Sequence, residues 1–293
     1  MRRVFLILFV LAASISGGYG AARWKAVDFV RARFCAMSAV SENASFRPNS
    51  YPLKNLPFVI LIIGKNNGAY LEKNLASVFS QCYDNFRIVY IDDASDDGSE
   101  SLAINLIENS SLRKKTQFVH REQVRGVLRN LVDSVKECGD EEIVVVLNGE
   151  DCLAHEWVLQ RLNQYYADPD LWLAYCQCIE YPSCKISAFR QYTQNGRTSP
   201  VQFPKFQTFY AKLFKQIDDS DLRYQGEYIQ GAAEIGYMLP MLEMAEGHFQ
   251  CLPDVLYAVN SPSSELDREY RAFFEKYVRS LKPYGKIISL GGT

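Results

Sequence analysis

Short apolar runs alternate with segments of helical spacing from residue 58 to residue 147. An apolar run of this length, bounded by turn residues, is typical of a strand that is buried on both faces of a sheet. The predicted strands lie at 58–63, 86–91, 116–119 and 142–147. The predicted helices lie between them, at 70–82, 100–109 and 127–138. This alternation predicts an α/β fold, with a Rossmann-like, mostly parallel sheet that carries helices on both faces.

The N-terminal segment follows a different pattern. Arg2 and Arg3 precede an apolar run over residues 4–15, and small residues follow up to residue 22. This is the pattern of a signal peptide, and a run extended to residue 22 would also serve as a membrane anchor. Both readings predict a protein that is exported or membrane-associated, without specifying the side of the membrane. We divide the chain into a signal peptide or anchor, a linker or stem, a main domain and a C-terminal helical tail, at 1–22, 23–56, 57–262 and 263–293.

Charge and cysteine content narrow the choice of partners. The chain has 32 basic and 34 acidic residues and a net charge of -2. It therefore lacks the excess of basic residues that would indicate a nucleic-acid partner. The eight cysteines fit no zinc-binding spacing. In an exported chain, Cys176, Cys178 and Cys184 would be candidates for disulfides, and otherwise they would be small buried apolar residues.

Polar clusters follow three of the predicted strands. They are Asn66-Asn67, Asp92-Asp93 and residues 148–151. Ligands of parallel α/β sheets bind beyond the carboxyl ends of the strands, so we expect these clusters to gather at one edge. No Gly-x-Gly-x-x-Gly motif and no Walker loop follows the first strand, which disfavours a dinucleotide site and a P-loop.

Two of these clusters are rich in carboxylates. Glu150 and Asp151 stand side by side in a turn, where they could hold Mg²⁺ or Mn²⁺ together with phosphate oxygens or form a plain acidic helix cap. Residues 92–98 carry four carboxylates, which could accept a nucleobase N–H or form an acidic turn. The residue pattern alone leaves both alternatives open for each segment.

The ordered set of motifs resembles the family 2 glycosyltransferases. The matching segments are the strand that ends in Gly64-Lys-Asn-Asn67, the helix with Ser77-Val-x-x-Gln81, the segment Asp92-Asp-x-Ser-x-Asp-Gly98, the helix start Arg125-Gly-x-x-Arg129-Asn130, and Leu147-Asn-Gly-Glu-Asp151. The last segment stands where the family carries an Asp-x-Asp-Asp metal motif. The resemblance covers roughly residues 57 to 262 and implies a GT-A fold, a nucleotide-sugar donor such as a UDP-sugar, and a divalent cation, Mg²⁺ or Mn²⁺.

The resemblance also implies roles for individual residues. Asp151 would bind the metal, and Asp93 would hold the base of the nucleotide. The residues implied to bind the nucleotide-sugar are Asn66, Asp92, Asp93, Arg129 and Glu150.

The second half resembles a narrower group within that family. Residues 172–182, 206–214, 231–244 and 256–260 carry this likeness. In that group an Asp at position 234 is the catalytic base, which implies that Glu234 deprotonates the acceptor hydroxyl in an inverting transfer, with Glu243 in reserve. An acid at the start of a helix is also favoured by the helix dipole alone. The acceptor would be a glycan, a lipid or a protein, in glycan or lipopolysaccharide-type synthesis.

The chain departs from the family pattern at several positions. Asn148 and Glu150 replace two carboxylates of the metal motif, and Lys205 and Gln207 stand where the narrower group tends to have His and Arg. These changes allow a rival hypothesis, in which the chain is a catalytically decayed binding or scaffold protein. A nucleotidyltransferase ranks last, because the loop after the first strand only faintly imitates the Gly-rich basic loop of that class.

Overall fold

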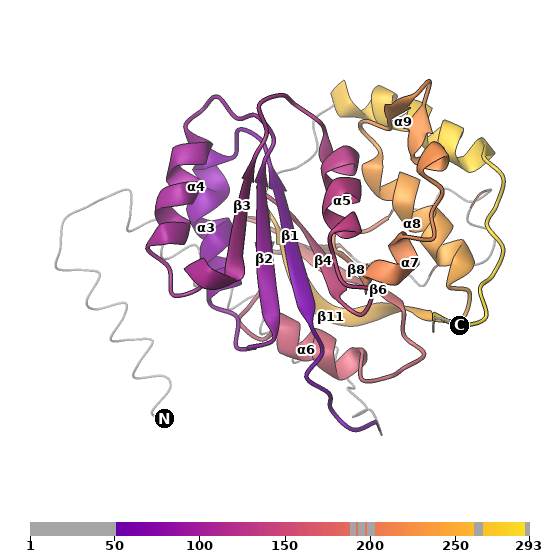
Figure 1. The fold of residues 1–293 in the computed structure, drawn as a ribbon, viewed down its shortest axis with the longest axis horizontal. Coiled ribbons are helices and arrows are strands. Elements are labelled where there is room, and N and C mark those ends of the chain that lie inside the picture. The colour runs from indigo at the N-terminus through magenta and orange to yellow at the C-terminus, as the bar shows by residue number, and fades with distance from the viewer. Residues whose placement is uncertain (1–50, 188–191, 193–196, 198–202, 261–265, 291–293) are drawn as a thin grey trace.

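The computed structural model describes residues 51–187, 192, 197, 203–260 and 266–290 (Figure 1). The predicted signal peptide or anchor and most of the predicted linker lie outside the described residues. Among the residues that are described, no helix is both long and apolar enough to cross a membrane.

The first half of the sheet is parallel, as predicted. It consists of β1 (Phe58–Gly64), β2 (Phe86–Asp92), β3 (Thr116–His120) and β4 (Ile143–Asn148), in the spatial order β3-β2-β1-β4. All seven residues of β1 are buried. Each fully buried Ile, Leu, Val or Phe side chain contributes roughly 1.5–3 kcal/mol, so β1 is the central strand of the core.

The second half of the sheet is mixed, which corrects the prediction of a mostly parallel sheet. Its strands are β5 (Cys152–Leu153), β6 (Leu173–Glu180), β7 (Lys185–Ser187), β8 (Gln207–Tyr210) and β11 (Phe249–Val259). β8 runs antiparallel to both β4 and β6, whereas β11 runs parallel to β6. The strand-helix cycles that indicated a parallel sheet end at β4, and antiparallel neighbours require no crossover helix.

Helices cover both faces of the sheet (Figure 1). One face carries α3 (Gly68–Phe79), α4 (Ser99–Glu108) and α6 (Val158–Tyr165), which pack on Ile60 and Ile62 of β1. The other face carries α5 (Val127–Lys136), α7 (Ala211–Phe214) and α8 (Ala233–Met244), which pack on Val59, Leu61 and Ile63. The alternating side chains of β1 therefore divide the core into two layers.

The remaining elements are short or peripheral. They are η1 (Arg113–Lys115), η2 (Asp219–Leu222), the hairpin of β9 (Arg223–Tyr224) and β10 (Glu227–Tyr228), and α9 (Leu266–Ser280). α9 belongs to the predicted C-terminal tail and contacts α8. It thereby brings Arg271 to the carboxyl edge of the sheet (Figure 1). Residues 288–290 then line a cavity at the amino ends of the strands.

The cysteines of the described part form no disulfide. Cys176 and Cys178 have free thiols, so the second alternative, small buried apolar residues, describes these two. Cys176 and Cys178 are 0% and 1% exposed in β6, which is the environment of small apolar core residues.

Candidate functional site

The polar clusters after β1 and β4 meet at one edge of the sheet. The buried Asn67 amide donates a hydrogen bond to the Gly149 carbonyl at 2.8 Å. Asn74 of α3 donates to the carbonyls of Asn148 and Asp151 at 3.0 and 2.7 Å. A side chain at Gly149 would place its Cβ 2.7 Å from the Gly64 Cα, so only glycine allows the two loops to approach this closely. The predicted convergence of strand ends is therefore confirmed for these two loops.

The acidic segment after β2 forms a hydrogen-bonded turn. The Asp92 carboxylate is fully buried and accepts hydrogen bonds from the backbone and hydroxyl of Ser95 at 3.2 and 2.5 Å. Asn66 accepts a bond from the Asp96 backbone N–H at 2.9 Å and joins this turn to the loop after β1. Hydrogen bonds from Ser99 lower the pKa of Asp97. The polar groups of this turn hold the two loops together.

Asp93 orders the loop that precedes α5. Its two carboxylate oxygens accept hydrogen bonds from the backbone N–H groups of Arg125 and Gly126, both at 2.8 Å. Gly126 has φ +81, in the region that disfavours a side chain. Asp93 is only 4% exposed, so its main contribution to the site is to hold the backbone of this loop in place.

Asp151 is enclosed by hydrogen bonds. Its side chain is 0% exposed, and it accepts bonds from the Tyr257 hydroxyl at 2.9 Å and from the Asn260 backbone N–H at 2.8 Å. Burial first, and the charge of Asp151 second, raise the pKa of Tyr257, which keeps this hydroxyl protonated as a donor. The Lys205 ammonium lies 3.8 Å from the same carboxylate.

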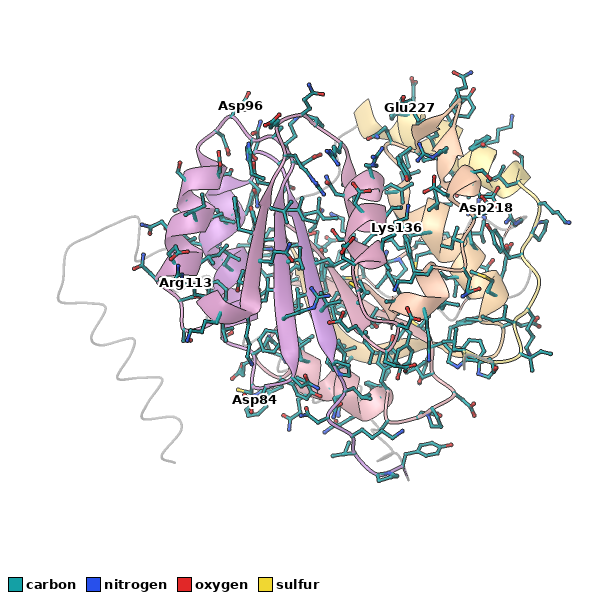
Figure 2. The ribbon with its side chains drawn as sticks, viewed as in Figure 1. Asp84, Asp96, Arg113, Lys136, Asp218 and Glu227 are labelled. Carbon is teal, nitrogen blue, oxygen red and sulfur yellow. The ribbon has the colours of Figure 1, made fainter. Side chains whose placement is uncertain are left out.

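A cavity of about 480 Å³ opens at this edge, beyond the carboxyl ends of β1, β2 and β4. Its charged lining residues are Lys65, Asp93, Lys205, Glu234 and Arg271. Its apolar and aromatic lining residues include Ile63, Val124, Val127, Val146, Leu147, Ile229, Tyr237 and Tyr257. Figure 2 shows Asp96 and Glu227 at this edge of the molecule and Asp84 at the opposite one.

Glu234 enters the cavity from the first turn of α8, where the helix dipole favours an acid. It forms an ion pair with Arg271 of α9, and the two side chains are 23% and 36% exposed. The reserve candidate Glu243 is placed elsewhere. Arg197 binds both of its carboxylate oxygens at 2.5 and 2.8 Å, and the cavity lining does not include it. Glu243 is therefore a structural residue, and this corrects the reserve assignment.

The structure brings only part of the predicted site into the cavity. Asp93 and Glu234 line it, and Asp151 lies behind it, in contact with the lining residues Lys205 and Tyr257. The predicted residues that do not line the cavity are Asn66, Asp92, Arg129 and Glu150. Arg129 instead pairs with Asp133 at 3.3 Å within α5.

Sequence reasoning missed Arg271 as a lining residue. It lies on α9, outside the segments that resemble the family, and no motif marks its position. Gln230 was also missed. It lines the cavity beside Gly126.

The residues present do not fit a divalent cation held by protein carboxylates. A hard cation needs accessible oxygen ligands, but both oxygens of the buried Asp151 already accept hydrogen bonds. Asn148 offers no charge at the first motif position, and Glu150 lies outside the cavity lining. Within the described residues, no group of three or more His, Cys, Asp or Glu side chains could hold a metal ion.

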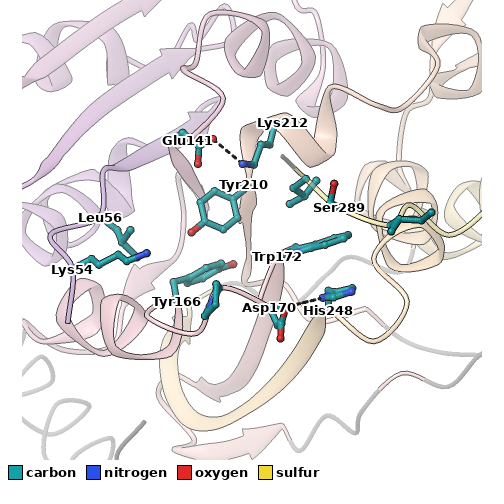
Figure 3. A pocket seen from close by; sticks show the side chains of 13 residues that line it. Lys54, Leu56, Glu141, Tyr166, Asp170, Trp172, Tyr210, Lys212, His248 and Ser289 are labelled. Atoms are coloured by element: carbon teal, nitrogen blue, oxygen red, sulfur yellow. Dashed lines mark hydrogen bonds and ion pairs between the residues drawn. The ribbon is translucent and has the colours of Figure 1, made fainter. Parts of the chain in front are cut away.

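A second cavity, of about 350 Å³, lies at the amino ends of β1 and β4 (Figure 3). Trp172 and His248 stack there with ring centroids 3.8 Å apart. Lys212 pairs with Glu141 at 2.7 Å and His248 lies 3.8 Å from Asp170. The polar clusters predicted from the sequence lie at the other end of the sheet.

In α/β proteins of this class, ligands bind beyond the carboxyl ends of the parallel strands, where the charged cavity lies. Comparison with known proteins identifies the family. The model of glycosyl transferase family 2 matches residues 59–225, more than half of the 293 residues. The chain belongs to this family.

Individual relatives are distant. An uncharacterized glycosyltransferase of Haemophilus influenzae is 29% identical over 110 residues, and the match spans 37% of this chain and 42% of that protein. The mannosyltransferase PcManGT from Pyrobaculum calidifontis, solved with GDP-Man and Mn²⁺, is similar with a TM-score of 0.57 and 18% identity, over 89% of this chain and 75% of that one. TarS of S. aureus, solved with UDP-GlcNAc, has a TM-score of 0.53 and 14% identity, over 73% and 61% of the two chains. These structural likenesses concern the fold, which is thereby consistent with GT-A.

Proposed function

We propose that this glycosyltransferase moves a sugar from a nucleotide diphosphate donor, a UDP-sugar, to an acceptor hydroxyl with inversion at the anomeric carbon. The reaction would belong to glycan or lipopolysaccharide-type synthesis. The observation that carries the proposal is the joint lining of one cavity by Glu234 and by Lys65, Lys205 and Arg271. The carboxylate can take the proton of the acceptor hydroxyl, and the cations can stabilise the negative charge of the departing diphosphate.

The donor end of the cavity combines an apolar wall with positive charge. Val124 and Val127 line it and are 55% and 44% exposed, so they offer an uncovered apolar surface to the nucleobase or the sugar. Asp93 fixes the loop that joins Val124 to Val127 through the N–H groups of residues 125 and 126. Cations placed where charge develops stabilise a leaving group without reorganisation during the reaction.

The acceptor end is assigned to Glu234. Its carboxylate takes the proton of the acceptor hydroxyl while the oxygen forms a bond to the anomeric carbon. The bond from that carbon to the phosphate oxygen breaks on the opposite face, and its electron pair leaves with the nucleotide diphosphate. Arg271, paired with Glu234, holds the carboxylate in place before the acceptor arrives.

The test is a donor screen that measures release of UDP or GDP from a panel of nucleotide-sugars. With the donor that responds, Glu234→Gln should lower kcat by about 100-fold or more, the scale of general-base loss. Glu141→Gln is the matched control, because Glu141 is 74% exposed in the second cavity. Full activity in the Glu234→Gln variant would remove Glu234 from the role of base.

The rival function, a decayed family member that acts as a binding or scaffold protein, is favoured by one observation. Asn148 stands in place of a motif carboxylate at the edge of the cavity. Calorimetry with UDP-sugars, with and without Mn²⁺, separates the two functions. Heat of binding supports the transferase site, and silence under both conditions supports decay.

Location at a membrane or outside the cell stays a prediction from residues 1–22. N-terminal sequencing of the mature protein tests it. A new N-terminus near residue 22 indicates cleavage of a signal peptide, and an intact Met1 indicates a retained anchor.

A further inference from the structure

The geometry points to Lys205, in place of a divalent cation, as the charge that stabilises the departing diphosphate. The inference rests on the proposed function, since it concerns the leaving group of that reaction. It predicts a transferase that works without a metal ion, although the family motif at 148–151 is a metal motif in the proteins that this chain resembles.

The first observation is the burial of Asp151, the one residue of segment 148–151 that matches an Asp of the family's metal motif. Asp151 has no exposed surface, and Tyr257 and Asn260 donate to its two oxygens. A cation could reach this carboxylate only if the residues that cover it moved, because the side chain has no exposed surface. In its present arrangement, Asp151 anchors its neighbours and does not face the cavity.

The second observation is the place of Lys205. Its ammonium lies 3.8 Å from the Asp151 carboxylate, and its side chain is 39% exposed and lines the cavity. The ammonium therefore stands between the buried carboxylate and the space assigned to the donor.

The third observation is the balance of charge. The charged lining residues of the cavity are three cations, Lys65, Lys205 and Arg271, against two carboxylates, Asp93 and Glu234. Asp93 is committed to two backbone N–H groups, and Glu234 and Arg271 pair with each other, so Lys65 and Lys205 carry the positive charge that is left in the lining. A lining of this kind attracts a diphosphate directly, whereas a site for Mg²⁺ or Mn²⁺ needs at least one accessible carboxylate beside the phosphates.

The chemical step requires no further reactant. As the bond between the anomeric carbon and the phosphate oxygen breaks, the negative charge on the diphosphate grows, and the Lys205 ammonium stabilises it as a compact point charge. Lys205 neither gains nor loses a proton.

The experiment uses the full-length protein, dialysed against EDTA, with UDP and GDP as probes in calorimetry and with the responding donor in an initial-rate assay. We expect the wild type to keep its affinity and its rate within twofold whether EDTA or Mn²⁺ is present. Lys205→Met should weaken binding of the diphosphate by at least tenfold in EDTA, and Lys205→Arg should retain most of it. Thermal unfolding of each variant checks that the fold is intact.

Lys136→Met is the matched control. Lys136 also lies near a carboxylate, at 3.4 Å from Asp219, but it is on the surface of α5, outside the cavity lining (Figure 2). Its affinity and rate should equal those of the wild type.

Two outcomes would overturn the inference, and they differ from each other. Loss of nucleotide affinity and rate in EDTA, restored by Mn²⁺, would show a metal-dependent transferase and would leave the proposed function standing. Absence of binding and of donor turnover under both conditions would remove the proposed function and the inference with it.

Discussion

The two cavities at opposite ends of the sheet contain similar residue types but differ in how their charges are arranged. At the amino ends, Lys212 is paired with Glu141, and His248 lies beside Asp170 and stacks on Trp172. At the carboxyl ends, Lys65, Lys205 and Arg271 line one space with Glu234. Lys65 follows β1, Lys205 precedes β8 and Arg271 lies on α9. We infer that charges which come from three separate parts of the chain and meet at the carboxyl ends of parallel strands distinguish a ligand site from a surface hollow of comparable size.

The strongest test of this difference concerns stability in the amino-end half. Asp254 of β11 is buried, and Arg161 of α6 binds it at 2.7 Å. Arg161→Met removes the cation from a buried carboxylate, which costs about 3 kcal/mol or more of the free energy of unfolding. Urea unfolding should show this loss, while KM for the donor stays unchanged. A raised KM would show that the two ends of the sheet are not separate in function.

A second, smaller effect is expected at the carboxyl ends. Asp93→Ala removes the acceptor of two backbone hydrogen bonds and loosens the loop before α5. We expect nucleotide affinity to fall by about tenfold, equivalent to ~1.4 kcal/mol. Calorimetry with UDP and GDP measures it. Asp170→Ala, in the second cavity, is the control, and an equal loss in that variant would contradict the comparison.

Arg271→Met should have a more modest effect. Arg271 is 36% exposed, and an ion pair at such a site is worth about 1 kcal/mol or less. We expect a rise of about fivefold in KM for the donor, with thermal stability nearly unchanged. An unaltered KM would place α9 outside the site.

The smallest effect is a pH dependence of the segment that leads into α8. The hydrogen bond from Tyr228, with Arg223 close by, lowers the pKa of Asp219 from 3.8 to about 2. Because the folded-state pKa is depressed, Asp219 stabilises the fold above pH 4 and loses this contribution as the pH falls from about 4 to about 2. Asp219 is 43% exposed, so the contribution is below about 1 kcal/mol. Asp219→Asn should reduce the difference in unfolding free energy between pH 5 and pH 3, and an unchanged difference would refute the assignment.

The sequence predicted the features that depend on neighbouring residues better than those that depend on contacts between segments far apart in the chain. β1 to β4 and the loops after β1 and β4 follow from short apolar runs and the turn residues behind them, because local pattern alone determines them. The insertion of β8 between β4 and β6 depends on pairing between segments far apart in the chain. Local periodicity carries no information about such pairing.

The same distinction holds for single residues. Glu234 was identified because it stands in a motif. The burial of Asp151 could not be foreseen, since it depends on Tyr257 and Asn260, more than 100 residues away. Arg271 reaches the cavity only through the packing of α9 on α8.

The most direct test of the account is a crystal structure of the protein grown with UDP or GDP in EDTA. The account predicts that the nucleotide lies in the carboxyl-end cavity, with its diphosphate in contact with Lys205 and its base against Val124 and Val127. A nucleotide bound beside Trp172 and His248, or a diphosphate that approaches none of Lys65, Lys205 and Arg271, would contradict it.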